Sequence, residues 1–486
     1  MKWILSLILF FPGLLSGQQT IHIPIKFQVS KAHCLFNFME TISGQPETSP
    51  SLFNYFLESA LPGDRKVQAL IQNWKATDFD FQYEIPGYPP RRKGYGSTLE
   101  QLEMYAARAG ELDNFEWWTL GLIPNSLHQK TIAILRSIEP YYDSLIWNPQ
   151  LDSFSIQISQ LSAYAEEKEL SKYLTAIRGF YGSNWSDEMP FVVSLYPIPG
   201  HTGNIISTPR SNMLLCGMLV GNSQFDGLMG IALHEIAHTL YQEQPKAFQW
   251  QLFEWFDSAA SSYGDFAYSY INEALATAIG NGWVYEKLNG SLNQEDWYAD
   301  HYIDRYAKAI YPIVKQYLER EQTIDEPMVQ ELVSVFEQTF PFAIFEYQNL
   351  FNDFQLFSDV ADQQVPRLIE MVQENFRTSS YLISTPILAS ESLARMEQAQ
   401  SSTRFFVITQ RVRQTLGRLE TSIPELKQYQ VLFPDRPFML RFLTADKHAV
   451  IIIHSDRELV EFKKGLTFLK EEVRLNVLEP IIWLDD

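Results

Sequence analysis

The amino-acid sequence predicts an α+β protein with more than one domain. Residues 228–241 carry apolar side chains at helical spacing, and short extended runs lie directly before them. Strand-like runs return after residue 403 and are followed by a helical pattern. With 486 residues, of which 46% are hydrophobic, the chain is long enough for two or three domains with cores of their own.

The N-terminus has the pattern of a secretory signal peptide. Lys2 precedes an apolar run, and small residues follow at Ser16 and Gly17. We therefore expect residues 1–17 to be a signal peptide that is cleaved near Gly17 or Gln18. The apolar run is too short to span a membrane comfortably, and no later stretch is long and apolar enough to do so. The mature protein is expected to be secreted or periplasmic and not integral to a membrane.

Charge and cysteine content narrow the classes of function. The chain has 58 acidic and 38 basic residues, which gives a net charge of −20. Phosphate neutralisation needs clustered Lys and Arg, so this balance argues against a nucleic-acid partner. The two cysteines, Cys34 and Cys216, could pair in an oxidising compartment or remain as two buried thiols. Neither lies in a metal-binding or nucleophile pattern.

Residues 18–150 are expected to form an N-terminal region. Thr20–Phe27 alternates like an edge strand, and helical patterns follow it. A turn-rich insert at 86–96, with several Pro and Gly residues, interrupts these patterns. Its basic residues could hold an acidic partner, but such a run is more often a solvated loop, which is what we expect here. These basic residues are Arg91, Arg92 and Lys93.

Residues 151–378 are expected to form the central domain. A helical pattern covers 157–180, and strand-like segments follow it. These extended runs lie at 191–196, 204–207 and 213–219. The helix at 228–241 comes next, with Asp226 placed to cap its start.

This central helix carries His234, Glu235 and His238, an H-E-x-x-H arrangement. Residues four apart lie one turn above the other on the same helical face, so the two imidazoles can bind one zinc ion from one side. Glu235 is offset enough to reach a metal-bound water rather than the metal. A ligand-rich patch on an apolar helix costs free energy unless something binds there. The competing interpretation is a buried pair of hydrogen-bonded histidines.

A catalytic zinc ion needs a third protein ligand and an open position for water. Two glutamates downstream are candidates. Glu273 lies in a predicted helix at 265–280, whose Ala and Gly residues would let another helix approach closely. Glu254 lies in a predicted connecting helix at 245–258, which reads as amphipathic with this glutamate facing solvent.

A small sheet that leads into an H-E-x-x-H helix resembles the gluzincin metallopeptidases, the thermolysin-like and aminopeptidase-like group. The resemblance covers about residues 190–310 and does not identify one family within the group. It implies a zincin-like catalytic core, in which a small mixed sheet and the H-E-x-x-H helix are followed by a helical lobe. It also implies an edge strand within 204–219 that binds extended peptide. Asn272–Glu273 is similar to the segment that supplies the glutamate ligand, so Glu273 is favoured over Glu254.

The resemblance further implies that a zinc-activated water attacks a peptide carbonyl while Glu235 moves its proton to the leaving amine. The donor that stabilises the oxyanion is expected in a predicted helix at 297–306, with Tyr306 or His301 as candidates, although such aromatic residues are usually core. One position departs from the pattern. Several gluzincins have an acidic residue four after the ligand glutamate, and here it is Thr277. Either another acid, such as Asp265, orients a ligand histidine, or zinc is held less tightly.

The remaining chain is expected to form a helical lobe and then a separate domain. Helical patterns continue from 312 to about 376, and residues 379–486 read as a small α/β domain. Its predicted strands lie at 404–409, 438–443 and 449–454, and its predicted helix at 457–469.

These features predict an exported zinc metallopeptidase, a hydrolase of peptide or protein substrates, with Zn²⁺ held by His234, His238 and Glu273. Glu235 is the predicted general base. A different class of function is a non-catalytic exported binding protein on a zincin scaffold. A third is a zinc hydrolase of non-peptide amides, because the same ligands and base serve that chemistry.

Overall fold

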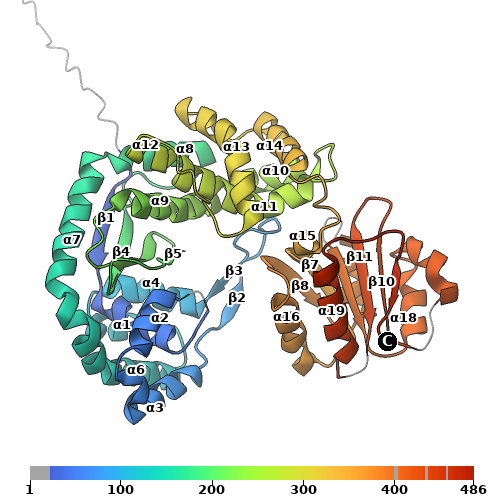
Figure 1. The fold of residues 1–486 in the computed structure, drawn as a ribbon, viewed down its shortest axis with the longest axis horizontal. Helices are drawn as coiled ribbons and strands as arrows, with labels where there is room; N and C mark the ends of the chain where they lie inside the picture. The colour runs from blue at the N-terminus through green and yellow to red at the C-terminus, as the bar shows by residue number, and fades with distance from the viewer. Residues whose placement is uncertain (1–21, 47, 399–402, 433–435, 456–457, 486) are drawn as a thin grey trace, which may run out of the picture.

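The computed structural model describes residues 22–46, 48–398, 403–432, 436–455 and 458–485. The predicted signal peptide lies outside these residues. The structure is α+β, as predicted, and contains a four-stranded sheet, a helical layer beside it and a six-stranded C-terminal sheet (Figure 1). None of the helices in these ranges is long and apolar enough to cross a membrane.

The four-stranded sheet has the order β1-β4-β6-β5. Its strands are β1 (Ile25–Val29), β4 (Phe191–Ile198), β6 (Met213–Leu219) and β5 (Ser207–Arg210). The first three are parallel, and β5 runs antiparallel to β6 at the other edge. The runs predicted at 191–196 and 213–219 are confirmed as β4 and β6, whereas the run predicted at 204–207 shares only Ser207 with β5. Because β1 pairs with β4, the N-terminal region and the central segment share one sheet.

Helices of the N-terminal region cover one face of this sheet, where Tyr196, Ile198 and Leu219 join their core. They are α1 (Lys31–Ile42), α2 (Pro50–Leu57), α3 (Arg65–Lys75), α4 (Thr98–Ala109), α5 (Leu112–Trp118) and α6 (Asn125–Tyr142). A hairpin of β2 (Gln82–Glu84) and β3 (Tyr95–Ser97) separates α3 from α4.

The opposite face packs on α7 (Asn148–Glu167), α8 (Leu170–Tyr181) and α9 (Phe225–Gln242). The predicted central helix is α9. The predicted cap is wrong, because Gln224 is the N-cap residue and makes no side-chain cap bond. Asp226 lies in the first turn instead, where a carboxylate also interacts favourably with the helix dipole, and it accepts a hydrogen bond from the Tyr164 hydroxyl.

The helical layer follows α9. It consists of α10 (Lys246–Asp257), α11 (Gly264–Thr277), the π-helix η3 (Ala278–Val284), α12 (Tyr285–Asn289), α13 (His301–Glu319) and α14 (Glu326–Thr339). The predicted connecting helix is α10, and Glu254 on it is exposed, as predicted. Asp300 caps α13 by accepting from the backbone N–H groups of Tyr302 and Ile303, so residues 297–300 are not helical, contrary to prediction.

The C-terminal sheet has the order β12-β10-β11-β9-β7-β8. Its strands are β7 (Asp353–Ser358), β8 (Ser380–Ser384), β9 (Thr403–Ile408), β10 (Phe438–Leu443), β11 (Ala449–His454) and β12 (Ile481–Trp483). Its helices are α15 (Tyr347–Leu350), α16 (Val365–Gln373), α17 (Ser390–Gln398), α18 (Val412–Leu419) and α19 (Val460–Glu472).

The helical prediction up to 376 is wrong at β7, which belongs to this C-terminal sheet. The strand is buried on both faces, and a short buried run cannot be told from a helix by periodicity alone. The C-terminal sheet therefore begins before the expected boundary at 379. The three strands predicted after 403 and the helix predicted at 457–469 are confirmed as β9, β10, β11 and α19.

Cys34 and Cys216 are buried and do not form a disulfide. Burial raises the pKa of each thiol to about 12, so both are unreactive at neutral pH. Of the two alternatives, the buried thiols describe this structure.

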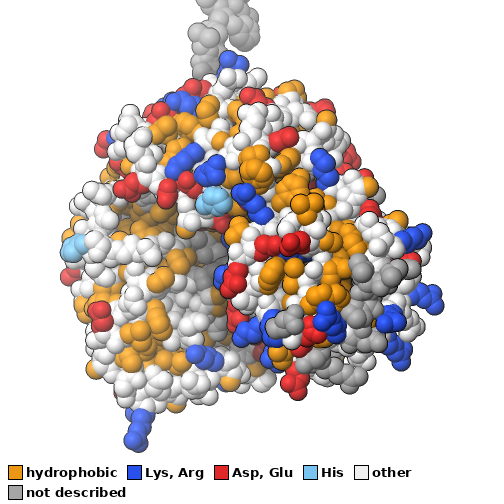
Figure 2. All heavy atoms as spheres, turned by 45° about the vertical axis from the view of Figure 1, so that its right-hand side comes forward, with side chains coloured by type: hydrophobic (Ala, Val, Ile, Leu, Met, Phe, Trp, Pro, Cys, Tyr) orange, Lys and Arg blue, Asp and Glu red, His pale blue; other side chains and the backbone are white. Residues whose placement is uncertain are grey.

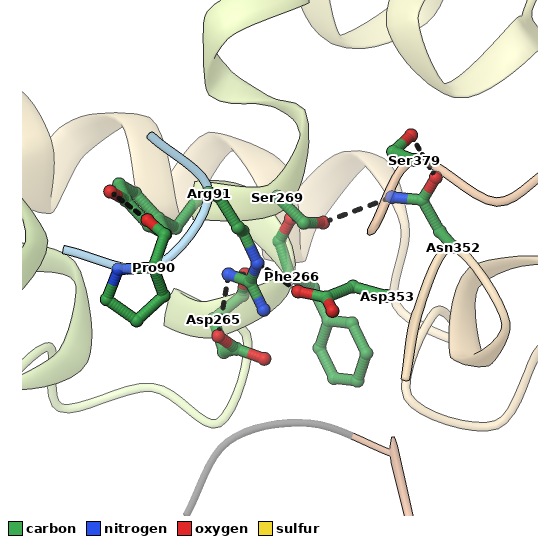
Figure 3. Close-up of polar contacts among 9 residues, drawn as sticks. Pro90, Arg91, Asp265, Phe266, Ser269, Asn352, Asp353 and Ser379 are labelled. Atoms are coloured by element: carbon green, nitrogen blue, oxygen red, sulfur yellow. Dashed lines mark hydrogen bonds and ion pairs between the residues drawn. The ribbon is translucent and has the colours of Figure 1, made fainter. Parts of the chain in front are cut away.

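The basic insert is not a solvated loop. Arg91 pairs with Asp265 at 2.7 Å and also with Asp353, so it connects the start of α11 to the start of β7 (Figure 3). Arg92 donates to the Tyr241 carbonyl at 2.9 Å, at the C-terminal end of α9. Only Lys93 is exposed among the three basic residues. The prediction of a solvated loop is wrong because the partners of Arg91 and Arg92 are carboxylates and a carbonyl from distant parts of the chain, which the local sequence does not reveal.

A second polar link joins the same two parts of the chain. The Asn352 amide donates to the Ser269 hydroxyl at 3.4 Å and accepts from the Ser379 hydroxyl at 2.7 Å (Figure 3). Away from these links, the surface is hollowed between the C-terminal sheet and the N-terminal part of the chain (Figure 2).

We expect Arg91→Met to destabilise the protein by about 3–5 kcal/mol, because it leaves two largely buried carboxylates without their shared counter-charge. Denaturant unfolding measures this loss. Lys93→Met, two residues along and exposed, is the matched control and should change stability by less than about 0.5 kcal/mol. Equal stabilities of the two variants would contradict a structural role for the Arg91 ion pairs.

Glu40 gives a pH-dependent prediction. Its side chain is 7% exposed and accepts from Trp74 Nε1 at 2.7 Å. Burial raises its pKa from 4.5 to about 7; the Trp74 hydrogen bond opposes this rise, and Glu103 and Asp80 add to it. Between pH 4.5 and pH 7 the folded chain binds a proton at Glu40 that the unfolded chain has released. The contribution of Glu40 to the free energy of unfolding therefore falls as pH rises through this window. The total loss is roughly 3 kcal/mol.

Glu40→Gln keeps an acceptor for Trp74 and removes this titration. The free energy of unfolding, measured at pH 5 and pH 8, should therefore fall by roughly 2.5 kcal/mol less in this variant than in the wild type, since pH 5 lies just above the lower pKa. Glu254→Gln, which changes an exposed glutamate, should follow the wild type. Parallel pH profiles for Glu40→Gln and the wild type would show that Glu40 is not buried in this way.

Candidate metal centre

Two helices bring three metal-ligand side chains together. His234 and His238 lie one turn apart on α9, and Glu273 approaches them from α11. The two Nε2 atoms are 3.1 Å apart, and Glu273 Oε2 lies 3.7 Å from His234 Nε2 and 3.5 Å from His238 Nε2. All three ligand atoms lie within 4.8 Å of one another, so this group could hold a metal ion. These are the three residues that the sequence predicted as ligands.

The close approach depends on glycines. An ideal Cβ on Gly280 would lie 2.4 Å from the Gly230 carbonyl oxygen and 2.6 Å from His234 Cβ, so any other residue there would push η3 away from α9. The small side chains of this segment thus have the role that the sequence predicted. A π-helical turn directly after the helix of Glu273 is unusual, and such turns occur often at functional sites.

An amide orients His238 rather than an acid. His238 Nδ1 lies 3.0 Å from Asn272 Oδ1, and since that oxygen can only accept, Nδ1 carries the proton. In the neutral ring this leaves the Nε2 lone pair facing Glu273 and His234. Asp265 pairs with Arg91 and does not take this role, and Thr277, in the position expected for an acid, is fully buried.

The charges of the group favour a cation. Burial alone would raise the pKa of Glu273, but the two imidazoles hold it well below the ordinary value. Burial also opposes the charge of His238, yet Glu273 outweighs it and raises the pKa of this histidine to about 9. Glu273 Oε2 is buried and has no hydrogen-bond partner among the described residues. A divalent cation would satisfy this oxygen, and two imidazoles with one carboxylate are a ligand set that suits zinc.

Glu235 follows His234 on α9 and is partly exposed. Burial raises the pKa of its carboxyl above the ordinary value, while the imidazoles of His234 and His238 lower it. A carboxylate in this position can accept a proton from a water beside the three ligands.

The two predicted oxyanion donors lie elsewhere. Tyr306 is fully buried, and its hydroxyl donates to the Leu332 carbonyl at 3.1 Å. His301 is the first residue of α13, and its ring contacts Tyr302 and Phe340. Both side chains belong to the packing of α13 and α14, and the structure does not bring them to the histidine pair.

Tyr298 is the tyrosine that lies beside His234. Its ring lies nearly parallel to that of His234, with centroids 6.1 Å apart and an interplanar angle of 22°. Burial, followed by the nearby carboxylate of Glu273, raises the pKa of its hydroxyl, which therefore stays protonated and able to donate. Tyr298 is not among the predicted site residues, because its sequence context reads as helical, whereas the Asp300 cap leaves it in a loop.

The C-terminal part of the chain also reaches this region. Arg377, in the loop before β8, pairs with Asp300 at 3.2 Å, two residues after Tyr298. Sequence reasoning missed this contact as well, since an isolated arginine in a loop carries no signal for it.

We expect Glu273→Gln and His238→Ala to lose tight zinc binding, because each removes one of three convergent ligands. Asn272→Ala should retain the site but lower its zinc affinity by about 10- to 100-fold, since it releases the His238 ring. Competition with a chelator measures each affinity. Glu254→Gln is the control and should match the wild type; wild-type affinity in Glu273→Gln would contradict the assignment.

Comparisons of this chain with known proteins do not indicate a function. No family model, no curated protein and no solved structure matches this chain at the level required for a significant match.

Proposed function

We propose that this protein is an exported zinc-dependent peptidase. The observation that carries the proposal is the convergence of His234, His238 and Glu273 within 4.8 Å, with Glu235 beside them on the same helix. The predicted signal peptide at 1–17 supports export. The zincin-like character of the core remains part of this proposal, since the structure shows a mixed sheet beside a ligand-bearing helix and the resemblance supplies the rest.

The side chains divide the chemistry of amide hydrolysis between them. His234, His238 and Glu273 would hold the zinc ion, which when bound would supply Lewis acidity to a carbonyl and to a water molecule. Glu235 accepts the proton of the attacking water and gives it to the amine that leaves. Its side chain is therefore a carboxylate again at the end of each turnover. Tyr298 donates a hydrogen bond to the oxygen of the carbonyl as negative charge develops there. Asn272 keeps the His238 ring in the orientation that binding needs.

Strand β5 is suited to hold an extended substrate. It is the last strand in the sheet order and runs antiparallel to β6, so its outer edge presents backbone groups. It also lies against α9, where the Thr239 hydroxyl donates to the Ser211 carbonyl at 3.3 Å. A peptide that pairs with β5 would run past the helix that carries both histidines.

Glu235→Gln should retain zinc and lose peptide hydrolysis by at least about 10²-fold, because it removes the base and leaves the ligands in place. Zinc content and cleavage of a peptide library, read by mass spectrometry, are measured on the same sample. Undiminished cleavage would refute the base. Full zinc occupancy without cleavage by the wild type would favour a binding protein, and cleavage of non-peptide amides alone would favour the third class.

Tyr298→Phe tests the oxyanion donor separately. It should lower kcat by about 10²- to 10³-fold with little change in KM, because the lost hydrogen bond acts mainly in the transition state. Tyr306→Phe removes the other tyrosine hydroxyl considered for this role, whose partner is the Leu332 carbonyl, and should leave kcat unchanged. A larger loss in Tyr306→Phe than in Tyr298→Phe would reverse the assignment.

A further inference from the structure

Apart from the metal group, the structure contains a cavity on the face of the four-stranded sheet opposite α9. Its volume is about 470 Å³, and α1, the segment after α3, α4 and β5 enclose it. His33 and Glu40 line it from α1, and Arg210 lines it from β5. None of these residues belongs to the metal group.

The floor of this cavity carries a buried imidazole with one unused nitrogen. His33 is 2% exposed, and its Nδ1 lies 3.1 Å from the Ser194 hydroxyl. Its Nε2 has no hydrogen-bond partner among the described residues. Burial lowers the pKa of His33 to about 3, so the ring is neutral and offers no positive charge. A buried nitrogen of this kind costs free energy unless a ligand or water bonds to it.

The polar lining is acidic. Glu40 accepts from Trp74 through one carboxyl oxygen, and no basic side chain among the described residues forms an ion pair with it. Glu103 pairs with Arg210 at 2.6 Å, so these two charges compensate each other. The exposed charged side chains of the lining are those of Asp78, Asp80 and Lys75. The described lining therefore carries four acids against two bases.

The apolar walls are aromatic. Phe36, Trp74 and Phe79 pack on one another, with ring centroids 5.3–6.0 Å apart, and Tyr196 closes the side next to the sheet. Carboxylates combined with aromatic rings attract an organic cation and repel an anion. The carboxylates and the imidazole of this cavity do not form a convergent set of metal ligands among the described residues. The ligand that suits this acidic and aromatic lining is an organic ammonium group.

The cavity is connected to the proposed substrate strand. Ile206, Thr208 and Arg210 line it at alternate positions along one edge of the sheet, so their side chains share one face. We propose that this cavity binds the ammonium group of a peptide that lies along β5, either its N-terminal ammonium or a lysine side chain. The peptide as carrier rests on the proposed function, whereas the preference for an ammonium group rests on the cavity alone.

Calorimetry on the full chain carrying Glu235→Gln, so that peptides stay intact, tests this proposal. The probes are a pentapeptide amide with a free N-terminus and one lysine, its N-acetyl form, its norleucine form, and the form with both changes. We expect the doubly neutral peptide to bind at least tenfold more weakly than the charged one, and the single change that causes the loss identifies the ammonium involved. Equal affinities for all four peptides would overturn the proposal.

Variants of the cavity locate the binding. Added to the same protein, Glu40→Gln should weaken the charged peptide at least tenfold and leave the doubly neutral one unchanged. Asp80→Asn, at the exposed mouth where it cannot disturb the core, should weaken the charged peptide about two- to fivefold, and Glu254→Gln should change neither peptide. Unchanged affinity in both Glu40→Gln and Asp80→Asn would overturn the assignment to this cavity.

A last arm separates this proposal from the peptidase proposal. n-Butylammonium and n-butanol are titrated as probes that contain no peptide bond. If n-butylammonium binds, Glu40→Gln abolishes this binding and no peptide binds, then the ammonium group that the cavity takes does not belong to a peptide. Peptide binding that depends on Glu40, in a protein whose wild type cleaves no peptide, would refute the peptidase function while it supports the ammonium site.

Discussion

The close contact between α9 and the π-helix η3 is the constraint on which the metal group depends. His234 and His238 need only the regularity of one helix to lie on a common face. Glu273 belongs to another helix, and its carboxylate meets them only because the backbone of η3 lies almost against that of α9. The position that permits this contact is Gly280, where a single Cβ would overlap the Gly230 carbonyl and the His234 backbone. The geometry of the site is thus set by the absence of side chains as much as by its ligands.

Helix α11, which carries Glu273, is fixed near both of its ends. At its start, Asp265 pairs with the largely buried Arg91, and just beyond its end Gly280 packs on α9. Arg91 also pairs with Asp353 of the C-terminal sheet, so one guanidinium couples the N-terminal insert, the ligand helix and the C-terminal part. A buried charge that pairs with both carboxylates favours this arrangement of the three segments, because removing Arg91 would leave two largely buried carboxylates without a counter-charge.

The sequence predicted what local rules determine. Helical periodicity and the spacing of His234 and His238 placed both histidines on one face, and short, largely apolar runs located β4 and β6. What it could not predict depends on partners distant in sequence. Arg91 and Arg92 read as solvated until the carboxylates and carbonyls around them are known, and β7 has no periodicity that separates it from a helix.

The oxyanion donor shows how one local feature redirects a functional assignment. Aromatic residues recur from 297 to 306, and a continuous helix would place Tyr306 and His301 as candidates. Because Asp300 caps α13, the helix begins at His301, four residues after Trp297, and Tyr298 lies in the loop beside His234. Tyr306 is buried against α14. The sequence does carry a start signal for this helix, because Asp300 directly precedes an amphipathic pattern.

Strand β5 gives the two proposed sites a common geometry. Side chains at alternate positions point to opposite faces of a sheet, so Thr208 and Arg210 line the acidic cavity while Ser207 and Pro209 face the side of α9. A peptide that extends the sheet at this edge would have the same alternation. Every second side chain would lie over the acidic cavity, and its backbone would lie beside the helix of the metal ligands. In the proposed arrangement the metal group would act on the peptide bond, which all peptides share, and the cavity would select among side chains or termini, which differ.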